Sequence, residues 1–492
     1  MFDTIVIGAG LGGLTAGAKL AKEGKRILLI EQHSLLGGYA SSFRRKGSRM
    51  EIALHELDGL HAEDPKRKAF DDLGVMEKVK FLPLPSFYRF VWRGMDIDLP
   101  HGVEPAKAVL KKHFPDQKDA IDHYYADLPE IRKHFRGMSR VPDSNEPATA
   151  GEFLDQLTDD EGLKMILAGN VGYYHQDPFQ VNLFYYAAGQ SSYFTGGGYF
   201  IQGGSQALSD YLGRVIRNNG GTIATNHRVH KILVEEGRAV GVEYQKVHRE
   251  GAKIIEARAE NIVANAAVPN VIEHLLPAGA APELEQKFKG WEHGTSATCL
   301  YLFLSRPGKE LGNATYSTFQ FDDEMEGIHD MGRFAYHSDF ARRPMIFTDY
   351  SQVDSRLAKP GKGVASVCLL DRLSDWEGLD EHAYQTHKGR VTELLLARLE
   401  RLVPGILEAV EHTELATPRT MAHYTGNPSG SIYGYAQSLA QSMPNRPTFR
   451  SPLPGLFFAS SWGQIGAGFT GAILGGYHCA KEMLREPKES PP

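Results

Sequence analysis

The sequence predicts an α/β protein built on a Rossmann-like parallel sheet, with an α+β domain inserted into it. Three observations near the start of the chain carry this prediction. A β-branched run, Thr4–Ile7, leads directly into the glycine-rich stretch GAGLGG. Apolar residues then recur at helical spacing as far as Gly24, where a helix would end. A second apolar run, residues 26–30, ends at Glu31, so the segment has the strand, turn, helix and strand of a dinucleotide-binding βαβ unit.

Each glycine of this turn has a physical task. Gly8 permits the tight turn, Gly10 lets the backbone approach a pyrophosphate, and Gly13 lets helix and strand pack closely. The N-terminus of the helix offers unpaired N–H groups and a partial positive charge to the phosphates. Glu31, about 20 residues beyond the glycines, is placed to accept hydrogen bonds from an adenosine ribose.

Composition excludes several other classes of protein. The 492 residues are 42% hydrophobic and 23% charged, which suits two or three globular domains. A net charge of −6 gives no reason to expect a nucleic-acid partner. Three widely spaced cysteines without a Cys-x-x-Cys motif argue against a disulfide framework or a zinc site, and no metal is expected. No apolar run approaches the ~20 residues of a membrane span, and no targeting segment precedes Thr4, so we expect a cytoplasmic protein.

The residues after Glu31 resemble a known family. A Gly-Gly pair, Gly37 and Gly38, lies six residues beyond this acid. Residues 7–55 resemble the flavoprotein family of phytoene desaturases, carotenoid isomerases and retinol saturases, which share a fold with the amine oxidases. In that family E-x(5)-GG continues the FAD site, and a segment similar to F-D-x-G-x-H follows, for which this chain has Met50–His55. The resemblance implies FAD and a domain of the glutathione-reductase and amine-oxidase type.

The resemblance resumes in the middle of the chain. Residues 199–208 (YFIQGGSQAL) are similar to the family's Y-x-x-GG-x-x-x-L, and an amphipathic helix is predicted to run from there to the cap signal NNGG. Strand-like runs at 229–234 and 239–244 predict a hairpin, and a strand at 262–264 leads to Asn265. In the family, the backbone near the position of Val229 lies against the adenine, and the strand before Asn265 returns the chain to the flavin domain.

A second G-x-G-x-x-G match, residues 466–471, lies near the other end of the chain. Residues 460–465 separate it from the strand predicted at 455–459, and no second strand or acid follows the helix predicted at 472–484, so it is not a separate nucleotide domain. The match resembles the family's C-terminal signature, in which a second helix points its N-terminus at the flavin. We therefore expect one FAD held by both ends of the chain. Without a nicotinamide domain, a quinone, oxygen or another acceptor is the expected electron partner.

The predicted FAD-binding residues come from the segments just described. They are Gly8, Gly10, Leu11, Gly12, Gly13, Glu31, Gln32, Gly37, Gly38, Tyr39, Ala40, Val229, Asn265, Ala266, Ser461, Trp462, Gly468, Phe469 and Thr470. The chain also departs from the family. Ser460-Ser461 replaces a Gly-Asp pair, Tyr39 stands where many amine-oxidase relatives have Arg, and Glu51 and Ala53 replace Asp and Gly before His55. These departures indicate a divergent branch whose substrate does not follow from the resemblance.

Two residues are candidates for catalysis. Hydride transfer between flavin and a carbon atom needs geometry, exclusion of water and a path for one proton. His55, at the family's histidine position, is the first candidate for that proton, with a structural hydrogen-bonding role as the alternative. Tyr433 resembles a family Y-G near the active site and is the second candidate.

The remaining sequence is assigned to a substrate domain. We expect residues 1–60, 199–290 and 448–485 to form the FAD-binding domain, 61–198 and 291–447 the substrate-binding domain, and 486–492 a disordered tail. Phe81–Arg93 carries five aromatics and two arginines, a composition that suits peripheral contact with a membrane. The alternative, strands packed under the substrate domain, is favoured because two prolines prevent a continuous amphipathic helix.

The leading functional hypothesis is an FAD-dependent oxidoreductase that desaturates or saturates carbon-carbon bonds of a long apolar substrate, a carotenoid, another polyene or a lipid acyl chain. The alternatives are a reduced-FAD-dependent isomerase of polyenes, a flavin amine oxidase, and a non-enzymatic lipid-binding protein of the same fold. The intact GAGLGG with Glu31 disfavours the last. The sequence leaves the substrate and the oligomeric state open.

Overall fold

The computed structural model describes residues 1–134, 147–247 and 251–485, and the predicted tail lies outside these residues. A first sheet is built around the predicted βαβ unit, because the buried β-branched and leucine-rich strands near the N-terminus pair in parallel. Its strand order is β10-β2-β1-β13, with β19 also pairing β13, and the antiparallel strands β12 and β11 extend it. The strands are β1 (Phe2–Ile7), β2 (Ile27–Ile30), β10 (Thr222–Ala224), β11 (His227–Glu235), β12 (Arg238–Lys246), β13 (Ile255–Ala264) and β19 (Leu456–Phe458).

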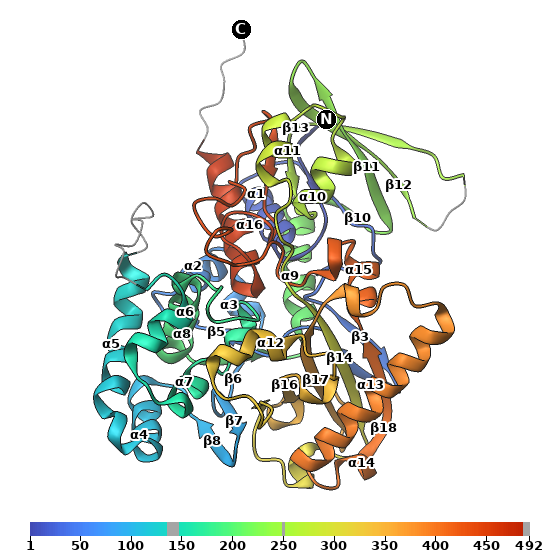
Figure 1. Ribbon diagram of the computed structural model, residues 1–492. Coiled ribbons are helices and arrows are strands. Elements are labelled where there is room, and N and C mark those ends of the chain that lie inside the picture. The colour runs from blue at the N-terminus through green and yellow to red at the C-terminus, as the bar shows by residue number, and fades with distance from the viewer. Residues whose placement is uncertain (135–146, 248–250, 486–492) are drawn as a thin grey trace.

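Three helices pack together beside this sheet: α1 (Leu11–Lys22), α9 (Ser205–Asn218) and α16 (Gly468–Leu484). The first and the last helix of the chain lie side by side (Figure 1), and their backbones approach closely at glycines. A Cβ atom added at Gly476 of α16 would lie 2.1 Å from the carbonyl oxygen of Gly12 in α1. The two glycine motifs therefore meet at one place in the fold.

A second sheet of seven strands has the order β18-β14-β17-β16-β15-β7-β8. Side chains of β14 alternate between its two faces. Leu300, Leu302 and Leu304 pack against α13, whereas Cys299 and Tyr301 face the core shared with α1. The elements are β7 (Tyr88–Trp92), β8 (Met95–Leu99), β14 (Ser296–Leu304), β15 (Ser317–Gln320), β16 (Met345–Asp349), β17 (Gly363–Asp371), β18 (Val410–Ala416) and helix α13 (Glu381–Leu402).

The other strands and α-helices lie around these two sheets. Helices α4 to α8 gather beside β7 and β8 (Figure 1). These other elements are β3 (Ser42–Arg45), β4 (Ser48–Glu51), β5 (Leu57–Asp58), β6 (Phe81–Pro83), β9 (Gly198–Ile201), α2 (Pro65–Asp72), α3 (Val75–Lys78), α4 (Val103–His113), α5 (Lys118–His134), α6 (Ala150–Leu157), α7 (Glu161–Leu167), α8 (Leu183–Gly196), α10 (Val268–Asn270), α11 (Pro282–Phe288), α12 (Met331–Ala335), α14 (Ile406–Ala409) and α15 (Pro418–Thr425). Among the described helices, none has both the length and the apolar character that crossing a bilayer requires.

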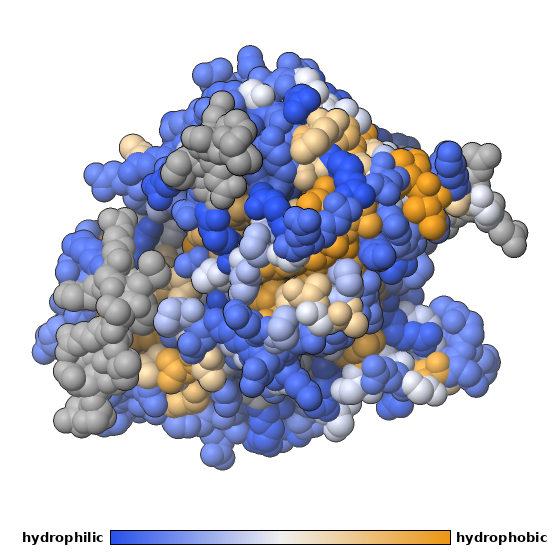
Figure 2. Space-filling model, turned by 90° about the horizontal axis from the view of Figure 1, so that it is seen from above, coloured by the Kyte–Doolittle hydropathy of each residue, from blue (hydrophilic) through white to orange (hydrophobic). Residues whose placement is uncertain are grey.

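The aromatic stretch at 81–93 is packed inside the protein. Phe87, Tyr88, Phe90 and Trp92 are 0%, 1%, 0% and 3% exposed, and they pack against helices α4 to α8. The interpretation as packed strands is confirmed, and a membrane contact through these side chains is wrong, because they are not at the surface. Seen from above, the molecule is largely hydrophilic, with apolar residues visible together near the middle of that face (Figure 2).

The strands of the first sheet come from residues 2–30, 222–264 and 456–458, and those of the second from 88–99 and 296–416. The division into an FAD-binding domain and an inserted substrate domain stays a prediction. Residues from both sheets line a single cavity, which is described next.

Candidate active site

A cavity of about 1060 Å³ extends from the N-terminal glycine turn to the second sheet. Every predicted FAD-binding residue except Gly13 lines it, as do His55 and Tyr433. Gly13 instead lies beneath the turn, where a Cβ atom would be 2.2 Å from the carbonyl oxygen of Gly8. The structure thus brings together residues from positions 8 to 470 that the sequence assigned to one site.

Two helix N-termini face this cavity without a capping side chain. Helix α1 begins after Gly10 and α16 after Ala467, and neither N-cap residue makes a side-chain hydrogen bond to its helix. Neither helix carries an acidic residue in its first turn. Their free N–H groups and partial positive charges are suited to phosphate oxygens and to negative charge on a flavin ring.

The glycines make room that a side chain would fill. Gly8 has φ +92°, a conformation that favours glycine. A Cβ atom at Gly12 would lie 2.0 Å from the carbonyl oxygen of Ala459, and one at Gly10 would lie 2.8 Å from Nδ2 of Asn265. Asn265 Nδ2 donates to the carbonyl oxygen of Gly8 at 3.3 Å and so supports the turn from below.

Glu31 lies at the end of β2 and is 9% exposed. The backbone N–H groups of Ala9 and His33 donate to its carboxylate oxygens at 2.7 Å and 2.8 Å. Burial raises the pKa of the Glu31 carboxyl, and these hydrogen bonds offset part of that rise. Each oxygen keeps a lone pair for a ribose hydroxyl, which is the role predicted for this residue.

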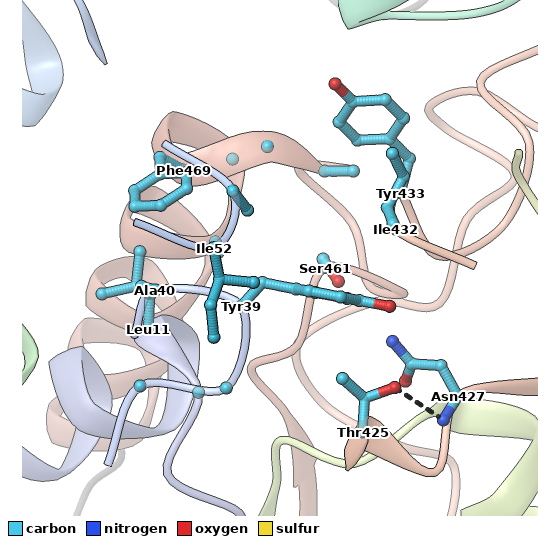
Figure 3. Close-up of a pocket in the computed structure, with 18 of the residues that line it drawn as sticks. Leu11, Tyr39, Ala40, Ile52, Thr425, Asn427, Ile432, Tyr433, Ser461 and Phe469 are labelled. Carbon is cyan, nitrogen blue, oxygen red and sulfur yellow. Dashed lines mark hydrogen bonds between the residues drawn. The ribbon is translucent and has the colours of Figure 1, made fainter. Parts of the chain in front are cut away.

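Tyr39 crosses the cavity between the two sheets. Figure 3 shows its ring reaching from beside Ala40 toward Thr425 and Asn427, with Tyr433 across the ring from these two residues. Its hydroxyl donates to the carbonyl oxygen of Ser431 at 3.1 Å. Tyr39 therefore links the glycine-rich segment to the loop before Tyr433 by a hydrogen bond.

Trp462 is 1% exposed, and its Nε1 donates to Asn427 Oδ1 at 3.3 Å. Its ring also contacts Tyr435 at a centroid distance of 5.0 Å. This tryptophan both lines the cavity and packs in the protein core.

The segment His55–Asp58 forms one wall of the cavity. The backbone carbonyl of His55 accepts a hydrogen bond from the Tyr316 hydroxyl at 2.6 Å, and burial lowers the pKa of the His55 ring to about 4. Asp58 accepts a hydrogen bond from the Thr470 hydroxyl, in the first turn of α16, at 2.5 Å. Burial would raise the pKa of Asp58, but the nearby Lys66 ammonium and this hydrogen bond outweigh it, so the pKa is lowered.

Sequence reasoning missed two carboxyl groups in this wall, Glu56 and Asp58. A lone acid after a family-like histidine carries no local signal of burial, because charged residues are usually exposed. Only the tertiary contacts reveal that both side chains lie inside. Asp58 has partners, whereas Glu56 has none among the described residues.

These observations define the class of protein. A βαβ unit with a glycine cradle, two uncapped helix N-termini and an acid at the position predicted for the ribose fit FAD, and the cavity continues from them toward the second sheet. The protein is an FAD-dependent oxidoreductase, and FAD when bound supplies hydride exchange.

Comparison with known proteins gives the family. Residues 11–484 match the family described as flavin containing amine oxidoreductase, and the chain belongs to that family. It is 24% identical to all-trans-retinol 13,14-reductase of Danio rerio, over 98% of this chain and 86% of that protein. It is 22% identical to the chloroplastic prolycopene isomerase of Arabidopsis thaliana, over 99% of this chain and 83% of that protein.

A solved oxidoreductase from Methanosarcina mazei superposes with a TM-score of 0.68 at 17% identity, over 98% of this chain and 100% of that one. This likeness concerns the fold. Together with the family match it confirms the predicted amine-oxidase-like α/β fold and the resemblance to retinol saturases and carotenoid isomerases.

Replacing Glu31 with alanine is expected to weaken FAD binding by about ten- to a hundredfold, because hydrogen bonds to a charged group contribute roughly 1.5–3 kcal/mol. Titration of the apoprotein with FAD, followed by flavin fluorescence, measures the change. Glu260→Ala, an exposed acid on β13, is the matched control and should bind FAD as the wild type does. Equal affinity in the Glu31 variant would contradict the assigned role.

Proposed function

We propose that the protein saturates a carbon-carbon double bond of a long apolar polyene, with FAD as its hydride-exchanging cofactor. One observation carries the proposal: the cavity is continuous from the glycine cradle to an apolar space against the second sheet. Residues that line this space are Tyr174, Phe184, Ile346, Leu369, Leu370 and Ile432. Such a lining binds an extended hydrocarbon by burying it from water and supplies few polar contacts that would favour a small polar substrate.

The chain's own residues would position the polyene and exclude water. Aromatic and aliphatic side chains from α8, β16 and β17 contact its length, which aligns one double bond with the cofactor. The similarity to a protein named as a retinol 13,14-reductase supports saturation. The similarity to prolycopene isomerases favours a second candidate, isomerisation of a polyene with reduced FAD.

Anaerobic incubation of the dithionite-reduced protein with all-trans-retinol in detergent micelles tests the proposal. We expect the flavin absorbance to return as the polyene gains two hydrogens, which mass spectrometry of the extracted product detects. A product of unchanged mass but altered retention would favour isomerisation. The proposal is contradicted if putrescine reduces the oxidised protein with release of peroxide, whereas retinol, lycopene and β-carotene leave the flavin unchanged. That result would favour amine oxidation.

The electron partner and the location complete the proposal. We assign a quinone or another diffusible redox molecule to the exchange of electrons with FAD. The described part of the first sheet holds one glycine cradle, which FAD would occupy, and a tightly bound nicotinamide cofactor would need another. Three buried, unpaired cysteines, Cys299, Cys368 and Cys479, support a cytoplasmic location.

A further inference from the structure

The carboxyl group of Glu56 is buried in the wall of the cavity without a partner. The residue is 8% exposed and lines the cavity, while neighbouring groups cover both of its carboxyl oxygens. Among the described residues, no hydrogen-bond partner reaches either carboxyl oxygen. Glu51, a buried acid five residues earlier, differs in this respect, because the backbone and hydroxyl of Ser205 and the backbone N–H of Leu54 donate to it. Buried polar groups without partners are rare and need an explanation.

No described residue supplies a cation that pairs with the Glu56 carboxyl group. Lys66 is fully buried nearby, but its ammonium lies between Asp58 and Asp64, at 3.6 Å and 3.3 Å. The other groups around Glu56 are His101 and a set of tyrosines. A Cβ atom at Gly198 would lie 2.9 Å from Glu56 Oε2 and 3.1 Å from His101 Nε2, and neither His101 nitrogen has a hydrogen-bond partner in the described part of the chain. The tyrosines are Tyr88, Tyr173, Tyr174, Tyr193 and Tyr316.

These surroundings hold the carboxyl group neutral. Burial raises the pKa of Glu56 to about 8. The nearby Tyr173 hydroxyl, although it makes no hydrogen bond to either oxygen, offsets part of this rise, and Asp58 adds to it. At pH 7 the group carries its proton. Burial lowers the pKa of the neighbouring His55 to about 4. At pH 7 its ring is therefore neutral, with a proton on one nitrogen only, and it is a poor proton donor.

The fold holds Glu56 close to the cofactor end of the cavity. Two residues further on, Asp58 accepts the hydrogen bond from Thr470, in the first turn of α16. That turn presents one of the two uncapped helix N-termini to the cavity. His55, the residue before Glu56, also lines the cavity, and its backbone carbonyl accepts the hydrogen bond from the Tyr316 hydroxyl.

We propose that Glu56 is the proton donor for saturation of the substrate's double bond, an inference that rests on the proposed function. Saturation adds one hydride and one proton, and the hydride is the part that FAD chemistry supplies. Once the Glu56 side chain turns from its covered position toward the cavity, the π electrons of the double bond form a C–H bond with the Glu56 proton as its O–H bond breaks, and the hydride pair forms the second C–H bond. Glu56 is left as a carboxylate and regains a proton from water after the product leaves. The apolar wall keeps water from competing for this role.

Infrared spectroscopy tests the protonation of Glu56 without catalysis. The FAD-bound wild type should show a protonated carboxyl C=O band that titrates with a midpoint near pH 8 and shifts when all-trans-retinol is added. Glu56→Gln should lose this band, and Glu51→Gln, which removes the hydrogen-bonded neighbour, should keep it. A band that persists in Glu56→Gln, or that ignores retinol, overturns the proposal.

Single-turnover reoxidation of the reduced protein by all-trans-retinol tests the proton transfer. Glu56→Gln should slow it by about 10²–10⁴-fold, the usual contribution of a general acid, while FAD binding and reduction by dithionite stay unchanged. The wild-type rate should fall above about pH 8, where Glu56 loses its proton, and the rate of Glu56→Gln should not show this fall. Glu56→Asp should recover part of the rate, and the rate of His55→Gln should still fall above about pH 8.

The outcomes separate the two proposals. A wild-type rate in Glu56→Gln overturns the role of Glu56 and leaves the proposed function standing. If the wild type reacts with none of retinol, lycopene and β-carotene, the proposed function is wrong. In that case the infrared titration and its shift with retinol decide separately whether Glu56 is a neutral acid in contact with an apolar ligand.

Discussion

Gly12→Ala is expected to purify without FAD and to unfold at a lower denaturant concentration than the wild type. The added Cβ atom would lie 2.0 Å from the carbonyl oxygen of Ala459 and 2.6 Å from Oδ1 of Asn265. The first of these is backbone, which cannot rotate away, so α1 and the segment after β19 must separate. Overpacking of this kind costs about 1–3 kcal/mol and sometimes more, and it displaces the N-terminus that faces the phosphates.

Flavin absorbance of the purified protein and a urea titration measure both effects. Gly389→Ala is the matched control, because Gly389 lies within α13 and a Cβ atom there would meet nothing within 4 Å. That change should leave FAD bound and stabilise the protein by about 0.5–1 kcal/mol. A yellow Gly12→Ala protein of wild-type stability would show that the close approach of the two segments is not required.

Arg446→Met is expected to release the loop before α16 and to reduce both stability and FAD retention. The guanidinium is 0% exposed and donates only to backbone carbonyls among the described residues. Nε bonds Gly463 at 2.8 Å, Nη2 bonds Ser461 at 3.2 Å, and Nη1 bonds Gln441 at 3.1 Å. Hydrogen bonds from a charged donor contribute roughly 1.5–3 kcal/mol each, so we expect a loss of at least about 3 kcal/mol.

Urea unfolding followed by circular dichroism gives the free energy, and flavin release during the titration shows whether the site opens first. Arg258→Met provides the comparison, since Arg258 is 40% exposed and pairs with Glu235 and Glu256 on the surface. Exposed pairs contribute about 0–1 kcal/mol. Equal losses in the two variants would mean that Arg446 does not organise this loop.

The parts predicted from the sequence are those with a local physical signature. The βαβ unit, the hairpin β11–β12 and helices α9 and α16 follow from periodicity and cap residues, and each is present. The second glycine motif could also be assigned to the first site, because the strand and acid of an independent unit are missing around it. In the structure its residues Gly468 to Thr470 line the same cavity as Gly8.

The parts that could not be predicted depend on contacts between distant segments. Arg446 is an ordinary surface residue in its sequence context, yet it is buried among carbonyl groups of two loops. Glu56 acquires its setting from Gly198 and His101, which lie far along the chain. The aromatic stretch around Phe87 was ambiguous for the same reason, because only the packing of α4 to α8 decides whether its rings meet lipid or protein.

The contact between Gly12 and Gly476 has a consequence for how the protein is made. The first helix emerges from the ribosome early in synthesis, but the helix that covers it is the last described element of the chain. The nascent polypeptide therefore cannot bring the two helix N-termini together around a flavin before α16 has emerged.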